Sequence, residues 1–367
     1  MQRRLVLQSA AAAAAAIALP SVRAQAWPGG PIKLVVGFPP GGGADALARV
    51  LGQKLSETWK QPVVIENKAG ASGTVAADYV AQQAGDGSTL LLTTINSHAL
   101  APAVLPKLRY PPERDFAPVA LLGLTPNLLI CGATQQAKTV KDVVALCKAQ
   151  PGRVTFGSAG AGTAQHFALE LFKLRANLDA LHVPYKGSGP LLTDLISGQI
   201  QYSFETMTAA TPHVKSGRAI AIAQTRASRV KAYPDVPTMQ EQGFPGFETF
   251  NWYGISGPAK LPASIAQKMN ADIQTALQAP EVREKFDGFG VEDGGGSRDR
   301  FAELQRSEIA KWAKVAKEAN VRVDGRTAAG RRGSAVPLRR GPGASPCGPG
   351  APARRGCRSR AGARRRA

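Results

Sequence analysis

Short apolar runs alternate with longer stretches of helical periodicity along most of this chain, and this alternation restricts the possible folds more than any other feature of the sequence. Residues 32–38 form an apolar run typical of a buried strand, and residues 44–59 carry apolar side chains at helical spacing. Residues 62–67 and 88–94 predict two more strands, with a helical segment between them. Strands that alternate with helices favour a parallel sheet whose strand-to-helix loops lie along one edge.

A second series of strand and helix patterns begins near Leu128. We therefore predict an α/β protein with two lobes of similar size, 27–125 plus 250–324 and 126–249, each a mostly parallel sheet flanked by helices. A chain that leaves one lobe, builds another and returns forms a hinge and a cleft. Because ligands of α/β folds bind outside the carboxyl ends of strands, this cleft is the expected binding site.

Both ends of the chain differ in composition from its middle. Residues 1–26 begin with a basic stretch and continue as a short apolar segment ending at Pro20, which predicts a secretory signal peptide cleaved near Ala24 or Ala26, for either Sec or twin-arginine export. From Gly325 onward the chain is rich in Arg, Gly, Pro and Ala without apolar periodicity, so we expect a disordered tail. A frameshift product and a nucleic-acid or membrane arm both stay open as interpretations of this tail.

The net charge of +20 is concentrated at these two ends. Twelve Arg in residues 325–367 and three in residues 1–25, with no acidic residue in either segment, leave a charge of +5 for residues 26–324. Such a mild basic excess does not indicate a nucleic-acid-binding domain. We therefore expect no nucleic-acid partner for the folded part of the chain.

The sequence contains no recognisable metal or catalytic motif. The four cysteines include no C-x-x-C pair, and the four histidines show no H-E-x-x-H spacing. Cys131 and Cys147 are expected to be buried thiols rather than a disulfide. We expect neither a metal nor a cofactor, and an enzyme is the less favoured interpretation. A Ser-His-Asp triad assembled by the fold stays open, because triads are defined in space and not by sequence order.

The loop after the first strand reads GFPPGGGADALAR, and it matches two kinds of anion site. Gly41, Gly43 and Ala46 satisfy the G-x-G-x-x-A fingerprint of dinucleotide-binding folds. Two preceding prolines, the acid Asp45 in the first helical turn and the export signal argue against a cytoplasmic oxidoreductase that binds NAD. Glycines at a helix N-terminus still expose backbone N–H groups, which attract a carboxylate as well as a phosphate. Asp45 either caps this helix or orients water or a cationic group of the ligand.

A similar glycine-rich turn, FGSAGAGTAQHF, occurs in the second series. Ser158 and Gly160 lie in the turn, and Thr163 is the expected N-cap of the following helix. His166 either donates a hydrogen bond to the ligand or is a surface or capping histidine. The segment PYKGSGP, which includes Gly187, precedes another helix and serves as a further anion loop or as a purely structural turn. Glycine-rich loops in both lobes predict a clamp for an anion.

Five segments, in this order, resemble the Bug family of extracytoplasmic solute receptors of tripartite tricarboxylate transporters. They are GFPPGGGADALAR, VVIENKAGASGTVAA, SAGAGTAQHFALELF, HVPYKGSGPLLTDLISGQI and YPDVPTMQEQGFPGF, and the resemblance runs from about Trp27 to Val323. It implies a two-lobed, type II periplasmic-binding-protein fold that closes on a small carboxylate, without catalysis or a cofactor. It also implies a periplasmic location and membrane permease subunits as partners; we expect a monomer.

The resemblance further implies which residues bind the ligand. They are Phe38, Gly41, Gly42, Gly43, Ala44 and Asp45 in the first loop, Ser158, Ala159, Gly160, Thr163 and His166 in the second, Tyr185 and Gly187 in the third, and Thr94, Asn127 and Glu205 elsewhere in the cleft. Glu205 departs from the family pattern, in which Asp is usual, so the class of carboxylate stays open. An exported sensor subunit or an enzyme on the same fold is the alternative function.

Overall fold

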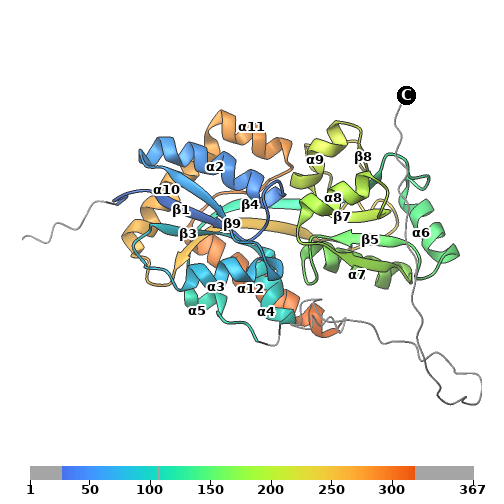
Figure 1. Cartoon of the computed structure of the whole chain (residues 1–367), viewed down its shortest axis with the longest axis horizontal. Coiled ribbons are helices and arrows are strands. Elements are labelled where there is room, and N and C mark those ends of the chain that lie inside the picture. Colours follow the sequence, from blue (N-terminus) through green and yellow to red (C-terminus); the bar gives the residue numbers. More distant parts are fainter. Residues whose placement is uncertain (1–26, 106, 319–367) are drawn as a thin grey trace, which may run out of the picture. The chain divides into compact units, whose positions relative to one another are not determined.

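The computed structural model of the chain describes residues 27–105 and 107–318 (Figure 1). All of them belong to one compact unit. The predicted signal peptide and the predicted tail lie outside the described residues, so both stay predictions. Within the described part of the chain, no helix is both long and apolar enough to cross a membrane.

Five strands form the first part of the sheet, which we call the first strand group. β1 (Ile32–Val36) pairs in parallel with β2 (Val63–Asn67) on one side and with β3 (Thr89–Thr94) on the other. β3 then pairs antiparallel with β9 (Phe250–Pro258), and β9 pairs antiparallel with the first part of β4 (Phe116–Gly132). The three strands predicted from the first sequence series are therefore present and parallel, and two antiparallel strands extend their sheet.

Helices cover both faces of the first strand group (Figure 1). α2 (Gly43–Trp59), α10 (Ala263–Gln278) and α11 (Pro280–Gly288) pack on one face, where the leucines of α2 are buried at helical spacing. α3 (Thr74–Ala81) and α12 (Arg298–Glu318) lie on the other face. The shorter helical segments on that side are η1 (Ala71–Gly73), η2 (Asn96–Leu100), α4 (Ala101–Val104) and α5 (Pro112–Asp115).

The second part of β4 begins the second strand group. There β4 pairs antiparallel with β7 (Tyr202–Thr206) and with β8 (Ala219–Gln224). β5 (Thr155–Ser158) lies between β7 and β6 (Leu181–Pro184) and is parallel to both. β5 and β6 end at the two glycine-rich loops that the sequence analysis singled out, around Gly160 and Gly187.

Two pairs of helices enclose the second strand group. α6 (Val140–Ala149) and α7 (Ala164–Ala176) contribute to one core cluster, which holds Phe156, Phe172 and Phe204 among other aromatic residues. α8 (Ser188–Ile196) and α9 (Met207–Lys215) contribute to a second cluster on the opposite face of the strands. Cys131 and Cys147 are buried free thiols, as predicted.

Two segments cross between the strand groups side by side. β4 pairs with β9 as far as Pro126 and with β7 and β8 from Asn127 onward. The second crossing segment leads from β8 back to β9 and is held at Thr225. The Oγ1 atom of Thr225 accepts from the Asn127 N–H at 2.9 Å and donates to the Thr249 carbonyl at 2.6 Å. The predicted lobe boundaries fall near these crossings, and they stay a prediction because the described residues form one compact unit.

Candidate functional site

A small cavity lies between the two strand groups and is lined by residues from both. Its volume of about 20 Å³ is enough for roughly one water molecule. The first strand group contributes Phe38, Pro39, Gly42, Gly43, Ala44, Asn96 and Tyr253, and the second contributes Ala159, Gln165, Ser188 and Thr206. The cavity is therefore narrow in this structure, with walls from both strand groups.

Four helices begin at this cavity. Gly43 is the first residue of α2, Gln165 lies in the first turn of α7, Ser188 begins α8, and Thr206 is the N-cap of α9; all four residues line the cavity. The first N–H groups of a helix have no partner within it and carry partial positive charge. The lining contains no Lys, Arg or His side chain. Backbone dipoles therefore create an environment that favours an anion.

The first anion loop, between β1 and α2, is held in shape by Asp45. The N–H of Gly41, a residue with φ of 82°, donates to Asp45 Oδ2 at 3.0 Å. Arg49 donates to both carboxylate oxygens at 2.9 Å, and Asn67 Nδ2 donates to Oδ1 at 2.9 Å. Burial raises the pKa of Asp45, but the hydrogen bonds from Arg49, Gly41 and Asn67 lower it overall. Asp45 is thus an ionised support of the loop and does not line the cavity.

Within the same loop, the N–H groups of α2 stay available to the cavity. The first hydrogen bond inside α2 runs from the Ala46 N–H to the Gly42 carbonyl at 3.0 Å. The N–H groups of Gly43 and Ala44 therefore precede the helical ladder. Both residues are buried and line the cavity, which is the arrangement that the glycine-rich sequence predicts.

The second anion loop, between β5 and α7, is held by two histidines. Ser158 Oγ lies 2.6 Å from His182 Nε2, and the rings of His182 and His166 stack with centroids 4.0 Å apart. The Gly162 N–H donates to His166 Nδ1 at 3.1 Å. Burial lowers the pKa of His166; burial, followed by the neighbouring His166 and Lys173, lowers the pKa of His182 to about 3. Both rings are therefore neutral near pH 7 and act as packing and hydrogen-bonding groups.

Some predicted residues line the cavity and others pack behind it. Those in the lining are Phe38, Gly42, Gly43, Ala44 and Ala159. Those outside the lining are Gly41, Asp45, Thr94, Asn127, Ser158, Gly160, Thr163, His166, Tyr185, Gly187 and Glu205. Most of the second set fix the loops, as Thr163 does: it is the N-cap of α7, as predicted, and its Oγ1 donates to the Gly160 carbonyl at 2.7 Å.

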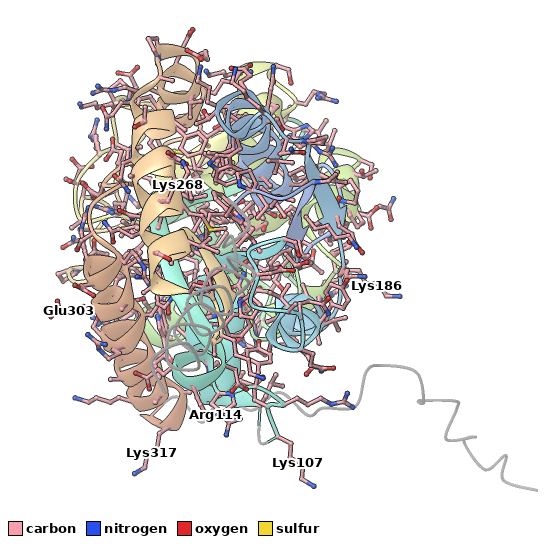
Figure 2. The ribbon with its side chains drawn as sticks, turned by 90° about the vertical axis from the view of Figure 1, so that its left-hand side faces the viewer. Lys107, Arg114, Lys186, Lys268, Glu303 and Lys317 are labelled. Carbon is pink, nitrogen blue, oxygen red and sulfur yellow. The ribbon has the colours of Figure 1, made fainter. Side chains whose placement is uncertain are left out.

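The third predicted loop approaches the first one closely. A Cβ atom on Gly187, whose φ is 124°, would lie 2.7 Å from Cδ of Pro39, so a larger residue does not fit there. Tyr185 turns away and donates its hydroxyl to Asp194 Oδ2 at 2.8 Å. Lys186 is exposed and projects from the surface (Figure 2). The lysine therefore supplies no charge to the cavity.

Several lining residues were not predicted from the sequence. They are Pro39, Asn96, Gln165, Ser188, Thr206 and Tyr253. Gln165 and Ser188 each stand next to a predicted residue in the first turn of a helix, so the anion-loop argument could have included them. Asn96 reaches across the cavity, where its Oδ1 accepts from the Ala164 N–H at 2.9 Å. No sequence signal distinguishes Tyr253, which comes from β9.

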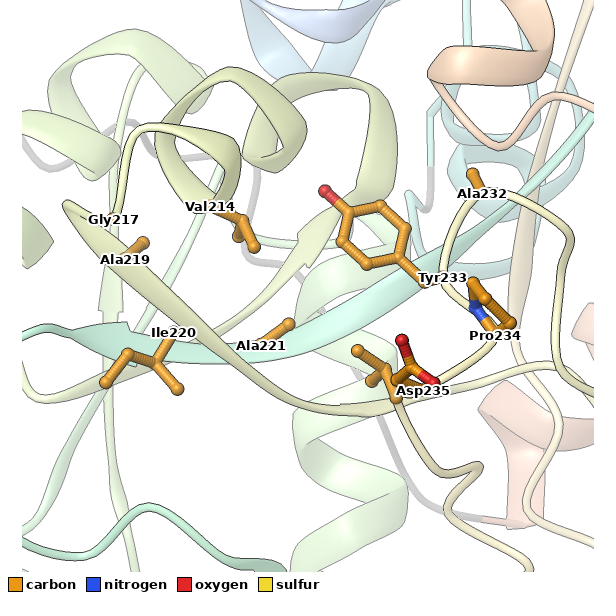
Figure 3. Close-up of a pocket in the computed structure, with 10 residues that line it drawn as sticks. Val214, Gly217, Ala219, Ile220, Ala221, Ala232, Tyr233, Pro234 and Asp235 are labelled. Atoms are coloured by element: carbon orange, nitrogen blue, oxygen red, sulfur yellow. The ribbon is translucent and has the colours of Figure 1, made fainter.

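A larger pocket of about 440 Å³ lies elsewhere, next to β8 (Figure 3). It is lined mainly by small and apolar residues between Val214 and Val236, and none of the predicted site residues belongs to it. The hydroxyl of Tyr233, in this lining, already lies 3.0 Å from Thr211 Oγ1. This pocket lacks the convergent helix ends of the small cavity. Among the described residues, no cluster of three or more potential metal ligands is present.

The fold closely matches solved structures of binding proteins. A structure described as periplasmic binding protein BugD aligns with a TM-score of 0.77 and 29% identity over 81% of this chain and 99% of that chain. R. palustris Rpa4515 with adipate aligns with a TM-score of 0.78 and 34% identity, over 81% and 99%. MatC from Rhodopseudomonas palustris with bound malate aligns with a TM-score of 0.74 and 32% identity, over 79% and 99%. The predicted periplasmic-binding-protein fold is thus confirmed.

Sequence comparison identifies the family. Protein BugT of Bordetella pertussis is 35% identical over 324 residues, which cover 88% of this chain and 99% of BugT. A UPF0065 protein from the tcbD-tcbE intergenic region of Pseudomonas sp. strain P51 is 37% identical over 316 residues, 85% of this chain and 93% of that protein. Residues 47–321 match the model of the tripartite tricarboxylate transporter family receptor. The chain therefore belongs to the tripartite tricarboxylate transporter receptor family, as its resemblance to the Bug proteins predicted.

Proposed function

We propose that this receptor captures a small carboxylate in its closed cavity, in the periplasm, and delivers it to the permease subunits of a tripartite tricarboxylate transporter. The observation that carries the proposal is the convergence of four helix N-termini on one cavity without a cationic side chain in its lining. Similar proteins are described with adipate and with malate, which are both dicarboxylates. The two glycine-rich loops are the parts that would hold the carboxylate groups.

Ligand entry would require the two strand groups to separate. A cavity of about 20 Å³ is too small for a four-carbon acid. Two hydrogen bonds join segments of the first strand group to segments of the second. Ser72 Oγ donates to the Ala161 carbonyl at 2.8 Å, and the Ala164 N–H donates to Asn96 Oδ1 at 2.9 Å. We infer a hinge at the crossing segments around Asn127 and Thr225. A ligand that contacts both groups would then favour the closed state.

Catalysis is not part of this proposal. Ser158 and His182 form a close pair, but Ser158 is fully buried and neither residue lines the cavity. The carboxylate nearest the stacked rings, Glu170, lies 3.7 Å from His166 and is not hydrogen-bonded to His182. A Ser-His-acid relay open to a substrate is therefore not supported. A sensor subunit that binds the same ligand without a permease is another alternative, and co-purification with permease subunits would distinguish it from a transport receptor.

A thermal-shift screen tests the proposal. The panel contains mono-, di- and tricarboxylic acids, nicotinate and amino acids, with the neutral diamides of the same dicarboxylic acids as matched controls. A true ligand at 100 times its Kd adds about 2.7 kcal/mol of stability, which corresponds to a rise in Tm of roughly 5–10 °C for a domain of this size. The ligand should be recovered unchanged by NMR. Absence of a shift for every acid would reject carboxylate binding, and consumption of the acid would favour an enzyme.

A further inference from the structure

Glu205, on β7, places a buried carboxylate immediately behind the cavity wall. The residue is 0% exposed. Its Oε1 accepts from Ser188 Oγ at 2.9 Å, from Gln165 Nε2 at 3.1 Å and from the N–H and Oγ1 of Thr206 at 2.6 and 3.1 Å. These three donor residues all line the cavity. Glu205 therefore determines how the polar groups of this wall are oriented.

The side chains of this wall leave two acceptor atoms without a donor. Within the described residues, Glu205 Oε2 and Gln165 Oε1 are buried and have no hydrogen-bond partner. Because a carboxylate can only accept, Gln165 turns its amide nitrogen toward Glu205 and leaves its carbonyl oxygen free. Ser188 and Thr206 likewise direct their hydroxyl protons at Oε1. A ligand that contacts this wall therefore meets hydrogen-bond acceptors that lack a donor.

The wall of the cavity formed by the start of α2 presents backbone hydrogen-bond donors. There the N–H groups of Gly43 and Ala44 at the start of α2 are donors without a helical partner. A buried acceptor without a donor is unfavourable, and more so when it carries charge. Burial raises the pKa of Glu205 overall, although the bonds from Thr206, Gln165 and Ser188 lower it. One N–H or O–H group on the ligand would relieve the unpartnered acceptors.

We propose that Glu205 and Gln165 set the ligand class: the carboxylate must also carry an amino or a hydroxyl group. Its carboxylate faces the N-terminus of α2, and its N–H or O–H group faces Oε1 of Gln165, the lining residue that Glu205 orients. This inference rests on the proposed function, because it concerns the ligand of the same cavity. It predicts amino or hydroxy acids in preference to plain dicarboxylic acids of the same length.

Calorimetric titration of the full chain with matched acids tests this ligand class. One series is succinate, malate and aspartate, and a second is glutarate, 2-hydroxyglutarate and glutamate; within each, only the group at the second carbon changes. A third series is propionate, lactate and alanine. In whichever series binds, we expect the hydroxy or amino acid to bind at least about tenfold more tightly than the plain acid, because a site built for a donor rejects an analogue that lacks it.

The same titrations with Glu205→Gln test the residue. The variant replaces the free acceptor by an amide, so the preference for the substituted acid should fall at least about tenfold. Glu308→Gln is the matched control, because Glu308 is also buried (5% exposed) but bonds Trp312 and does not line the cavity. It should keep the wild-type preference. If Glu205→Gln does not fold, Gln165→Leu removes the neighbouring acceptor and should show the same loss.

The outcomes separate this inference from the proposed function. Binding of plain acids as tightly as their substituted partners, by the wild-type protein, would overturn the inference and leave carboxylate capture intact. An unchanged preference in a folded Glu205→Gln or Gln165→Leu variant would also overturn it. If no acid of these series and none of the thermal-shift panel binds, both proposals are rejected together.

Discussion

Among single residues, Gly43 is one at which the two strand groups approach each other closely beside the cavity. A Cβ atom there would lie 2.9 Å from Thr208 Cβ and 3.1 Å from Thr206 Oγ1, although the position is helical and alanine is otherwise well tolerated. We predict that Gly43→Ala hinders closure and weakens ligand binding by about 1–3 kcal/mol, or roughly 5- to 150-fold. Titration calorimetry with the ligand found by the screen measures this loss.

The matched control for Gly43 is Gly30→Ala. Gly30 has no atom within 4 Å of a built Cβ, so alanine should bind as the wild type does. Equal affinities for Gly43→Ala and Gly30→Ala would show that closure does not bring α2 and α9 as close together in solution as in this structure.

His182 is the residue at which we predict a pH effect on stability. Its pKa in the folded protein is about 3, lowered mainly by burial from a reference of 6.5. Between these values the unfolded chain binds more protons, so stability present above pH 6.5 is lost as the pH falls. We expect the wild type to lose up to about 2 kcal/mol more than His182→Gln between pH 7 and pH 5.

Urea unfolding of both proteins at the two pH values measures that difference. Ser158→Ala is the control, because it removes the hydroxyl partner of His182 but keeps the half-buried ring, and it should retain the pH dependence. Parallel pH profiles for the wild type and His182→Gln would contradict the prediction.

At the level of elements, the loop from β1 to α2 depends on the ion pair of the buried Asp45 with the exposed Arg49. Asp45→Ala removes the acceptor for Gly41, Arg49 and Asn67, and we predict a loss of about 1.5–3 kcal/mol in the free energy of unfolding. Asp287→Ala is the matched control, since Arg283 and Asp287 form the same i, i+4 pair at 3.9 Å on the surface. The loss in the free energy of unfolding for Asp287→Ala should stay below about 1 kcal/mol. Similar losses in the two variants, measured by urea unfolding, would show that the loop does not need Asp45.

Strands and helices with strong periodicity could be predicted from the sequence, and those shaped by distant contacts could not. The strands predicted at 62–67 and 88–94 correspond to β2 and β3 within one residue. β9 was not predicted, because its residues are buried on both sides and NWYGISGP lacks strand alternation. α9 was missed as well, since Pro212 interrupts its pattern. The antiparallel pairing of β4 with β9 depends on strands far apart in the sequence.

For the whole molecule, the proposed hinge predicts contraction on binding. We expect the radius of gyration from small-angle scattering of the full chain to fall when saturating ligand is added, because closure brings the two strand groups together. Gly30→Ala should contract as the wild type does, whereas Gly43→Ala should contract only at higher ligand concentration. A profile that does not change with bound ligand would rule out hinge closure.

The candidate site could be predicted only in part because it forms at the scale of the whole fold. The glycine-rich loops identified Gly42, Gly43 and Ala44, since a backbone anion site has a local sequence signal. Thr206 and Tyr253 reach the same cavity from strands that are distant in the sequence. Glu205 was predicted to bind ligand directly, a role that stays a proposal. The structure adds that its Oε1 accepts hydrogen bonds from the lining residues Gln165 and Ser188.

The four helix ends at the cavity have a consequence for how such a receptor can evolve. Their attraction for anions comes from backbone N–H groups, which every amino acid except proline carries, so few single substitutions can delete it and no ordinary pH change can titrate it. Side chains in the lining are then free to vary without loss of anion capture. A lineage could exchange one acid for another through a few substitutions at positions such as Gln165 and Glu205 while the fold and its mode of closure stay the same.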